Sequence, residues 1–215
     1  MLHKFGSASE GLYPYGGLVH INDTLFGATS GGGGFGHGTI FSISLSGTNY
    51  RVLHSFGRTT DGSELTASLI GVNGTLYGTT YYGGTHGDGT VFSISTTGTN
   101  YRVLHNFGKG TDGRQPAAGL VELNGTLYGT TSLGGAHGDG TVYSVTPNGT
   151  ENVRHSFGGA FGSGKDGQDP LAGLIAVNEA LYGTTTLGGA NNHGIVFTLT
   201  PAGHERELYG EDVRR

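Results

Sequence analysis

The chain has 215 residues, with 45 glycines and no cysteine, so disulfides and thiolate chemistry are excluded. Eleven lysines and arginines against sixteen aspartates and glutamates give a net charge of −5, which argues against a nucleic-acid partner because phosphate binding needs a basic surface. No apolar run approaches the roughly 18 residues of a membrane span, so no span is predicted.

Three short phrases recur about every fifty residues. The phrase LHxFG, or a close variant, places a histidine at steps of 51, 51 and 50 residues, at His3, His54, His105 and His155. The phrase LYGTT places an aromatic ring at Phe26, Tyr77, Tyr128 and Tyr182, and we expect these tyrosines to be buried between repeats. A GTVF-like phrase follows each of them. The period predicts four repeats, at approximately 7–57, 58–108, 109–158 and 159–210.

The second repeat shows the predicted elements in chain order. Its strands are expected at residues 68–72, 75–80, 90–95 and 101–107. Asn73-Gly74 predicts a tight hairpin between the first two, a long loop at 81–89 follows, and no window has a helical period. Four antiparallel strands per repeat predict an all-β fold, a four-bladed β-propeller that forms a single domain over residues 1–215. A β-solenoid is the alternative, although its repeats are usually shorter.

The two ends of the chain each offer an additional outer strand. Residues 2–6 contain a complete LHxFG phrase, whereas the segment 204–210 continues into ELYGED, residues 207–212, where that phrase is expected. We therefore expect the N-terminal strand to complete the last blade and close the ring, with the C-terminal segment frayed or packed outside. The alternative is that the chain is cut from a longer array.

Several strings of the sequence resemble a known repeat family. LYGTTYYGGTHGDGTVFSI, YRVLHNFG and TDGRQPAAGL resemble the GloVer tandem repeats of bacterial proteins, and the resemblance covers essentially the whole chain. It implies an extracellular or cell-surface repeat domain, although the first residues show no signal peptide. A weaker similarity to kelch propellers lies in the paired glycines after the second strand, but the kelch tryptophan is missing.

Two classes of loop carry the distinctive polar residues, and in a propeller both are expected on one face. The loop between the second and third strands contains His37, Tyr81, Tyr82, His86, Asp88, His137, Asp139 and His193. The loop between repeats contains Asp61, Asp112 and Asp166, each followed by glycine. The other face carries tight turns, so we expect any ligand to contact the first face.

Each of these features also has a structural interpretation. An Asp-Gly pair is a common turn, and a histidine that recurs once per repeat can make a repeated structural hydrogen bond. The strand histidines His54, His105 and His155 are expected to be packed residues. In the innermost strands, His20 and Glu122 would oppose each other across a ring of four blades. We predict neither a metal nor a cofactor, since no loop has the acid cluster of a calcium site.

These observations favour a non-catalytic binding domain for glycans or another extracellular ligand. One alternative is a structural or adhesive surface module that associates with itself. A second is a glycan-active hydrolase or lyase, which would need two carboxylates roughly 5 to 10 Å apart or a suitably placed base. Repeats that resemble one another favour binding, because an active site needs residues that differ between repeats.

Overall fold

The computed structural model describes residues 1–57, 60–159 and 166–207. Apart from a short 3₁₀ turn at Ala8–Glu10, the described chain is built from strands, and it contains no helix long and apolar enough to cross a membrane. The strands form four antiparallel sheets, here numbered 1 to 4 in chain order, and each sheet is a four-stranded meander. Each predicted repeat therefore supplies the four strands of one sheet.

The strands of each sheet follow one another in chain order. Sheet 1 consists of β1 (Val19–Ile21), β2 (Thr24–Thr29), β3 (Thr39–Ser44) and β4 (Arg51–Ser55). Sheet 2 consists of β5 (Ile70–Val72), β6 (Thr75–Thr80), β7 (Thr90–Ser95) and β8 (Arg102–Asn106). Sheet 3 consists of β9 (Val121–Leu123), β10 (Thr126–Thr131), β11 (Thr141–Val145) and β12 (Glu151–Ser156). Sheet 4 consists of β13 (Ile175–Val177), β14 (Ala180–Thr184), β15 (Val196–Leu199) and β16 (Glu205–Glu207).

The predicted hairpin between the first two strands of a repeat has the expected turn geometry. Asn73 and Gly74 have φ values of 49° and 76°, and Asn124 and Gly125 have 53° and 77°. Positive φ at both central residues matches the right-handed twist of the flanking strands, and asparagine and glycine tolerate it best. The turn therefore sets the register between β5 and β6 and between β9 and β10.

The apolar core lies in three layers between neighbouring sheets. Within the described residues, Phe56 from sheet 1 packs with Leu76 and Phe92 from sheet 2 in the first layer. Phe107 packs with Leu127 and Tyr143 in the second, and Phe157 with Leu181 and Phe197 in the third. Glycines make room for these rings, since a Cβ on Gly78 would lie 2.6 Å from the Phe92 ring. Each sheet is therefore stabilised mainly by burial against the next.

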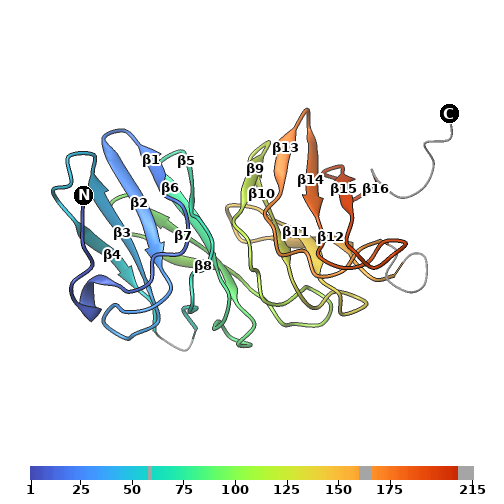
Figure 1. Cartoon of the computed structure of the whole chain (residues 1–215), viewed down its shortest axis with the longest axis horizontal. Helices are drawn as coiled ribbons and strands as arrows, with labels where there is room; N and C mark the ends of the chain where they lie inside the picture. Colours follow the sequence, from blue (N-terminus) through green and yellow to red (C-terminus); the bar gives the residue numbers. More distant parts are fainter. Residues whose placement is uncertain (58–59, 160–165, 208–215) are drawn as a thin grey trace.

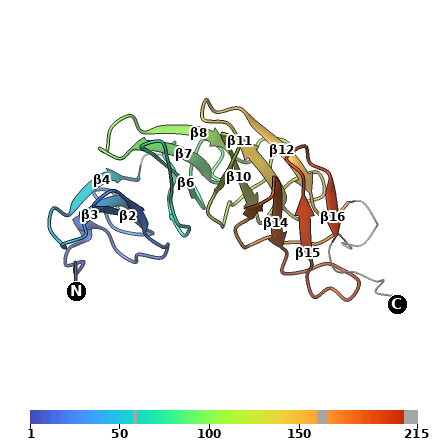
Figure 2. The ribbon, with the colours of Figure 1, turned by 90° about the horizontal axis from the view of Figure 1, so that it is seen from above.

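The sheets form a curved row that does not close into a four-sheet ring. Sheet 1 and sheet 4 lie at opposite ends of the molecule in Figure 1, and the view from above in Figure 2 shows an open arc. A ring of four would require a quarter turn between successive sheets. The predicted closed ring of four blades is therefore not observed.

Residues 2–6 do not complete sheet 4, contrary to our expectation. Sheet 4 has its own fourth strand, because Glu205–Glu207 pairs with Phe197–Leu199; the rest of the predicted C-terminal strand, residues 208–210, lies outside the described residues. The N-terminal segment packs on sheet 1 instead, where the His3 ring stacks on Tyr50 with centroids 3.9 Å apart.

The contacts of this N-terminal segment repeat those of an outer strand with the following sheet. His54 stacks on Tyr101 at 3.9 Å, as His3 does on Tyr50. The phenylalanine of the phrase meets the ring in the third strand in both cases, and the ring centroids are 5.4 Å apart for Phe5–Phe41 and 5.3 Å for Phe56–Phe92. Residues 2–6 therefore occupy the position of the outer strand of a sheet that would precede sheet 1.

The tyrosines of the LYGTT phrase test the importance of the layers between sheets. Tyr128 is buried against sheet 4, whereas its equivalent Tyr182 in the last sheet is only half-buried. We expect Tyr128→Ala to lower the free energy of unfolding by about 3–5 kcal/mol, as for other buried aromatic residues. Tyr182→Ala should cost about half as much or less, because half-exposed rings lose less apolar burial. Urea unfolding of the two variants at low protein concentration measures the difference, and equal losses would contradict this account.

Candidate functional site

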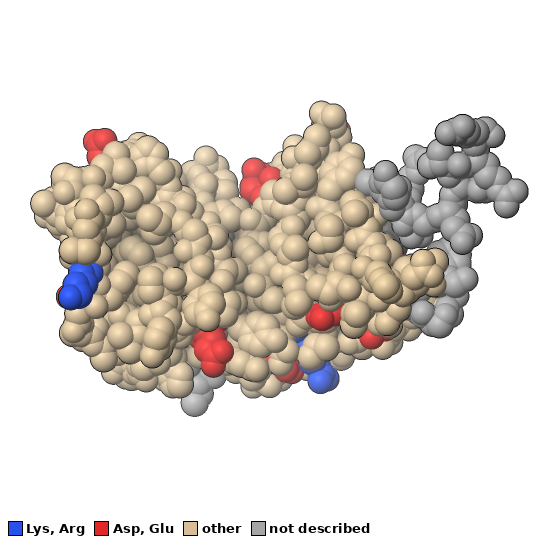
Figure 3. All heavy atoms as spheres, in the orientation of Figure 1, with Lys and Arg blue, Asp and Glu red and all other residues tan. Residues whose placement is uncertain are grey.

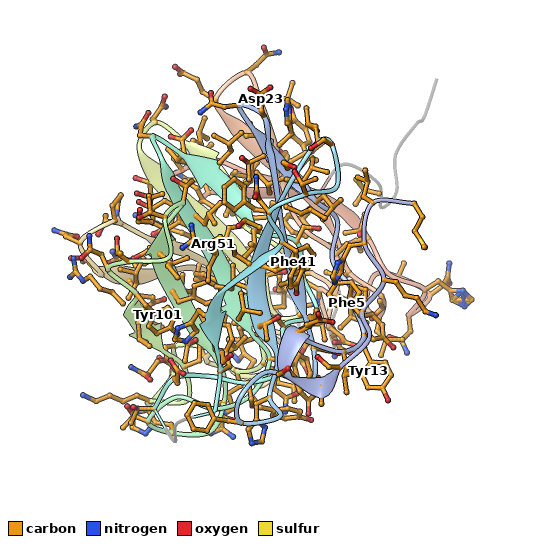
Figure 4. All side chains as sticks on the ribbon, turned by 90° about the vertical axis from the view of Figure 1, so that its left-hand side faces the viewer. Phe5, Tyr13, Asp23, Phe41, Arg51 and Tyr101 are labelled. Carbon is orange, nitrogen blue, oxygen red and sulfur yellow. The ribbon has the colours of Figure 1, made fainter. Side chains whose placement is uncertain are left out.

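Both predicted classes of loop lie at one edge of the sheets, which we call the loop edge. The loop between repeats pairs with the loop after the second strand: Ser63 N donates to Tyr82 O at 2.9 Å, and Tyr82 N donates back to Ser63 O at 3.2 Å. Arg114 and Leu133 exchange the same two bonds in the next repeat, at 2.8 and 3.2 Å. In Figure 4, Tyr13 of the first such loop lies at the opposite end of the sheet from Asp23, which lies in a tight turn.

The aspartates of the Asp-Gly pairs bind the strand histidines. His54 Nε2 lies 3.1 Å from Asp61 Oδ2, His105 Nε2 lies 3.0 Å from Asp112 Oδ2, and the equivalent atoms of His155 and Asp166 are 3.5 Å apart. Asp112 and Asp166 also accept hydrogen bonds from the backbone N–H groups of Gly108 and Gly158. These three predicted site residues thus hold the outer strand to the loop between repeats, which agrees with the structural interpretation of the Asp-Gly pairs and of the strand histidines.

A tyrosine of the following sheet covers the histidine of the first His–Asp pair, and a tyrosine covers His3 of the N-terminal segment in the same way. The Tyr101 hydroxyl donates to the backbone carbonyl of Asp61 at 2.7 Å, and its ring covers His54. The Tyr50 hydroxyl donates in the same way to the carbonyl of Glu10 at 2.5 Å. Burial, with a smaller contribution from the Glu10 carboxylate, raises the pKa of Tyr50 to about 12, so the hydroxyl remains a donor at neutral pH.

The four loop histidines are exposed to solvent. These residues, which come from successive repeats, are His37, His86, His137 and His193. The acids beside two of them are half-buried and point toward the next repeat: Asp139 Oδ2 accepts a hydrogen bond from Gln168 Nε2 at 3.1 Å, and Asp88 Oδ2 lies 3.7 Å from Arg114 Nε. No group of three or more histidines and acids suited to a metal is present in the described part of the chain.

The two tyrosines of the second loop have different environments. Tyr81 is half-buried, and its hydroxyl donates to Gln115 Oε1 at 2.9 Å. Tyr82 is exposed, and its ring meets Tyr81 edge-on with centroids 4.7 Å apart. Tyr81 therefore supports the loop, while Tyr82 offers its ring to solvent.

A cavity of about 530 Å³ opens beside the first His–Asp pair. Its lining residues come from β4, from the position just before β8 and from two loops: Phe35, Val52, Leu53, His54, Ser55, Asp61 and Tyr101. Of these, only Asp61 was predicted as a ligand contact. Phe35 has a visible signal in the sequence, because a phenylalanine between Gly34 and Gly36 has no strand neighbours to bury it. Its side chain is indeed exposed.

His20 and Glu122 do not face each other. They lie in β1 and β9, which belong to sheets 1 and 3, and sheet 2 separates these in the row. The carboxylate of Glu122 instead accepts a hydrogen bond at 2.5 Å from the N–H of Gly125 in its own hairpin turn. The predicted pairing depended on a closed ring of four sheets, and the open row removes its geometric basis.

The third repeat differs from the others at two positions that the sequence analysis did not single out. Tyr143 replaces the phenylalanine of the GTVF phrase, and Glu151 stands in the shortened segment where other repeats have Tyr50 or Tyr101. Tyr143 is fully buried, and its hydroxyl has no hydrogen-bond partner within the described residues. Burial raises the pKa of Glu151 to about 7, the nearby Asp112 carboxylate adds to this, and Arg154 opposes it. Glu151, which stands in place of a tyrosine, therefore lies near the carboxylate of Asp112, the partner of His105.

Replacement of Glu151 should stabilise the protein most at high pH. Its pKa is raised in the folded state, so folding favours the protonated form, and the ionised form is destabilising above about pH 7. Glu151→Gln should increase the free energy of unfolding at pH 8 by about 1 kcal/mol, a value reduced for partial solvent screening. The gain should disappear near pH 4, where the wild-type side chain is protonated in both states. Chemical unfolding at the two pH values measures it, and a gain that is independent of pH would rule out this origin.

The half-buried strand histidines should make the fold sensitive to acid. Burial lowers the pKa values of His105 and His155, although Asp112 and Asp166 partly oppose the effect. A lowered histidine pKa gives stability that is fully present above the unfolded value of about 6.5 and is lost as pH falls through it.

We therefore expect the melting temperature to fall as the pH is lowered from about 7 to about 5. The measurement uses the Glu151→Gln variant, because Glu151 changes the stability in the opposite direction over this range. The double variant His105→Gln and His155→Gln should be less stable but less dependent on pH in this range. An unchanged slope in that variant would show that other groups cause the acid sensitivity.

Comparison with known proteins supports the repeat architecture. The model of the Gloeobacter/Verrucomicrobia repeat matches residues 1–165. No curated protein sequence matches the chain. Among solved structures, a chain of "Crystal structure of Nidogen/Laminin Complex" is similar with a TM-score of 0.56 and 19% identity, over 89% of this chain and 61% of that one. TolB from Acinetobacter baumannii is similar with a TM-score of 0.53 and 11% identity, over 89% of this chain and 42% of that one.

These structural neighbours are propeller-like, and at such low identity they bear on the fold alone. The chain spans less than two thirds of the length of either neighbour. The similarity to kelch propellers finds no support among these matches. The family match covers most of the sequence and coincides with the phrases that build the sheets. The chain therefore belongs to the Gloeobacter/Verrucomicrobia repeat family.

Proposed function

We propose that the chain is a non-catalytic binding module that holds a hydroxyl-rich ligand, most simply a glycan, at its loop edge. The observation that carries the proposal is the cavity beside the His54–Asp61 pair, which combines aromatic faces with polar atoms. Membership of a repeat family and propeller-like neighbours are in keeping with a repeat or binding module. The resemblance described above supports a place at the cell surface or outside the cell.

The chemistry of the cavity suits a sugar ring. The exposed ring of Phe35 offers an apolar face on which the C–H face of a pyranose can stack. Ser55 and the Asp61 carboxylate offer hydrogen-bonding groups, and the carboxylate keeps acceptor capacity beyond its bond to His54. A concave site with a mainly apolar lining and a few polar groups is the usual form of a small-molecule site.

The repetition of the loops favours weak binding at several points. Each repeat presents one exposed histidine at the loop edge, and the second repeat adds the exposed ring of Tyr82. Figure 3 shows acidic side chains along this lower side of the molecule, on a surface with few charges elsewhere in that view. A polymer of repeated units can engage several such sites at once, so modest single contacts can give useful avidity.

The His–Asp pairs themselves support binding over catalysis. The same pair occurs in three repeats and brings the outer strand and the loop together each time, with the two side chains 3.0 to 3.5 Å apart. Tyr101 covers the His54 ring in the first of them. These groups are held in structural bonds, which suits a rigid wall for a ligand better than a base that must exchange protons.

A glycan array probed with the purified, labelled domain tests the proposal, followed by titration of any retained glycan against variants. Phe35→Ala should weaken binding at least tenfold, which corresponds to about 1.4 kcal/mol. His86→Ala and Asp88→Ala should weaken the binding of longer glycans, which reach the second repeat.

The matched control is Thr99→Ala, since Thr99 lies in an exposed turn at the opposite edge. Loss of binding in Thr99→Ala with normal binding by Phe35→Ala would show that the wrong edge has been assigned. Retention of no glycan by the folded domain would contradict the ligand class.

A further inference from the structure

The two ends of the row expose faces that every internal interface covers. At the sheet 4 end, the side chains of Ile175 and Val196 are 60% and 41% exposed. The residues equivalent to Val196 in sheets 2 and 3, Val91 and Val142, are 0% exposed because the following sheet covers them. An apolar groove of about 250 Å³ is left on this face, lined by Gly173, Ile175, Tyr182, Gly183, Thr184 and Val196.

The sheet 1 end exposes the opposite side of the same kind of interface. Leu18 is 56% exposed, whereas its equivalents Leu69, Leu120 and Leu174 are 3%, 6% and 6% exposed. Each of those three leucines belongs to the layer that packs against the preceding sheet. Sheet 1 therefore presents the leucine side of an interface, and sheet 4 presents the side that such leucines cover.

A hydrogen bond of the internal interfaces has no counterpart at the sheet 4 end among the described residues. Thr79 Oγ1 donates to the carbonyl of Ala118 in the next repeat at 3.1 Å, and Thr130 Oγ1 donates to the carbonyl of Ala172 at 3.2 Å. Thr184 is the equivalent donor in sheet 4, and it is exposed. The equivalent acceptor in the first repeat is Gly16, which lies in the loop that leads to sheet 1.

The N-terminal segment shows where another sheet belongs. Residues 2–6 pack on sheet 1 as the outer strand of a preceding sheet would, with His3 on Tyr50 and Phe5 against Phe41. The last repeat lacks this phrase in its sequence, since residues 207–212 read ELYGED. The first repeat is thus preceded by an additional outer-strand phrase, and the last repeat lacks one. The additional phrase can therefore take the place of the missing one.

We propose that a second copy of this chain docks end to end, with sheet 4 of one copy against sheet 1 of the other. Leu18 and Leu25 of one copy fill the groove beside Ile175 and Val196 of the other, as Leu174 and Leu181 do against sheet 3 within the chain. The two contacting faces differ, so the contact is heterologous, and repetition gives a closed ring or a filament according to the turn per copy. The interface continues the three that already hold the sheets together.

Sedimentation equilibrium of the purified chain tests this assembly, with one variant for each end. The wild type should show a mass that rises with concentration above the 22.1 kDa of one chain. Val196→Glu and Leu18→Glu each block one face, so both variants alone should lose self-association beyond a monomer. An equimolar mixture of the two should form a dimer, because each variant keeps the face that the other lacks.

The control is Leu133→Glu, which changes an exposed leucine in the loop between β10 and β11 of the internal sheet 3 and should associate like the wild type. Circular dichroism and melting confirm that the variants are folded, and Ile175→Glu provides a second block of the sheet 4 face. A wild type that stays monomeric up to about 1 mM would overturn the proposal. The dissociation constant would then exceed about 1 mM, so the free energy of association would be weaker than about 4 kcal/mol. A mixture that stays monomeric, or association that neither variant disturbs, would overturn it as well.

Discussion

The packing of one sheet's outer-strand phenylalanine onto the next sheet is the contact on which the structure depends. Phe56, Phe107 and Phe157 are fully buried, and each meets the third-strand ring of the following sheet with centroids about 5 Å apart. Burial of one such ring is worth about 2–3 kcal/mol, and edge-to-face contact adds to this. A single four-stranded sheet has no second layer of its own, so these contacts make the repeats into one body.

The histidine of each His–Asp pair lies two residues before this phenylalanine, and the pair has a related role. It anchors the outer strand to the loop that leads into the next sheet, with the Tyr101 ring of that sheet over His54 in the first interface. The third repeat changes this arrangement, because Glu151 replaces the tyrosine and Tyr143 replaces a phenylalanine. A buried hydroxyl and a carboxylate of raised pKa thus enter a layer that is otherwise apolar or neutral.

Much of the fold follows from local sequence, whereas the arrangement of the sheets does not. Asn73-Gly74 determines a hairpin between β5 and β6 through short-range geometry, and the strands appear where they were predicted. The closed ring was wrong because the angle between sheets depends on the volumes of side chains in contact, which a strand count does not contain. The opposition of His20 and Glu122 depended on that ring and was lost with it.

The candidate site was predictable to a similar degree. Gathering of both loop classes at one edge follows from the up-and-down order of the strands, and His86 and His137 are exposed there as a ligand contact requires. Asp61 was placed correctly in the loop, but its partner His54 lies seven residues away on a different element, so only the folded chain shows that they meet. Phe35 was missed because it falls outside the repeated pattern. A residue that appears in one repeat alone is a better guide to a site than residues that all repeats share.

The row of sheets also determines how the molecule comes apart. Each sheet packs against its immediate neighbours in the row, so stability approximates a sum of repeat terms and nearest-neighbour terms, as in a one-dimensional chain of coupled units. Sheets 2 and 3 have two neighbours each, while sheet 4 has one and leaves Ile175 and Val196 uncovered. Opening should therefore start at the ends and move inward, so that amide protons in β6 and β10 exchange with solvent more slowly than those in β14.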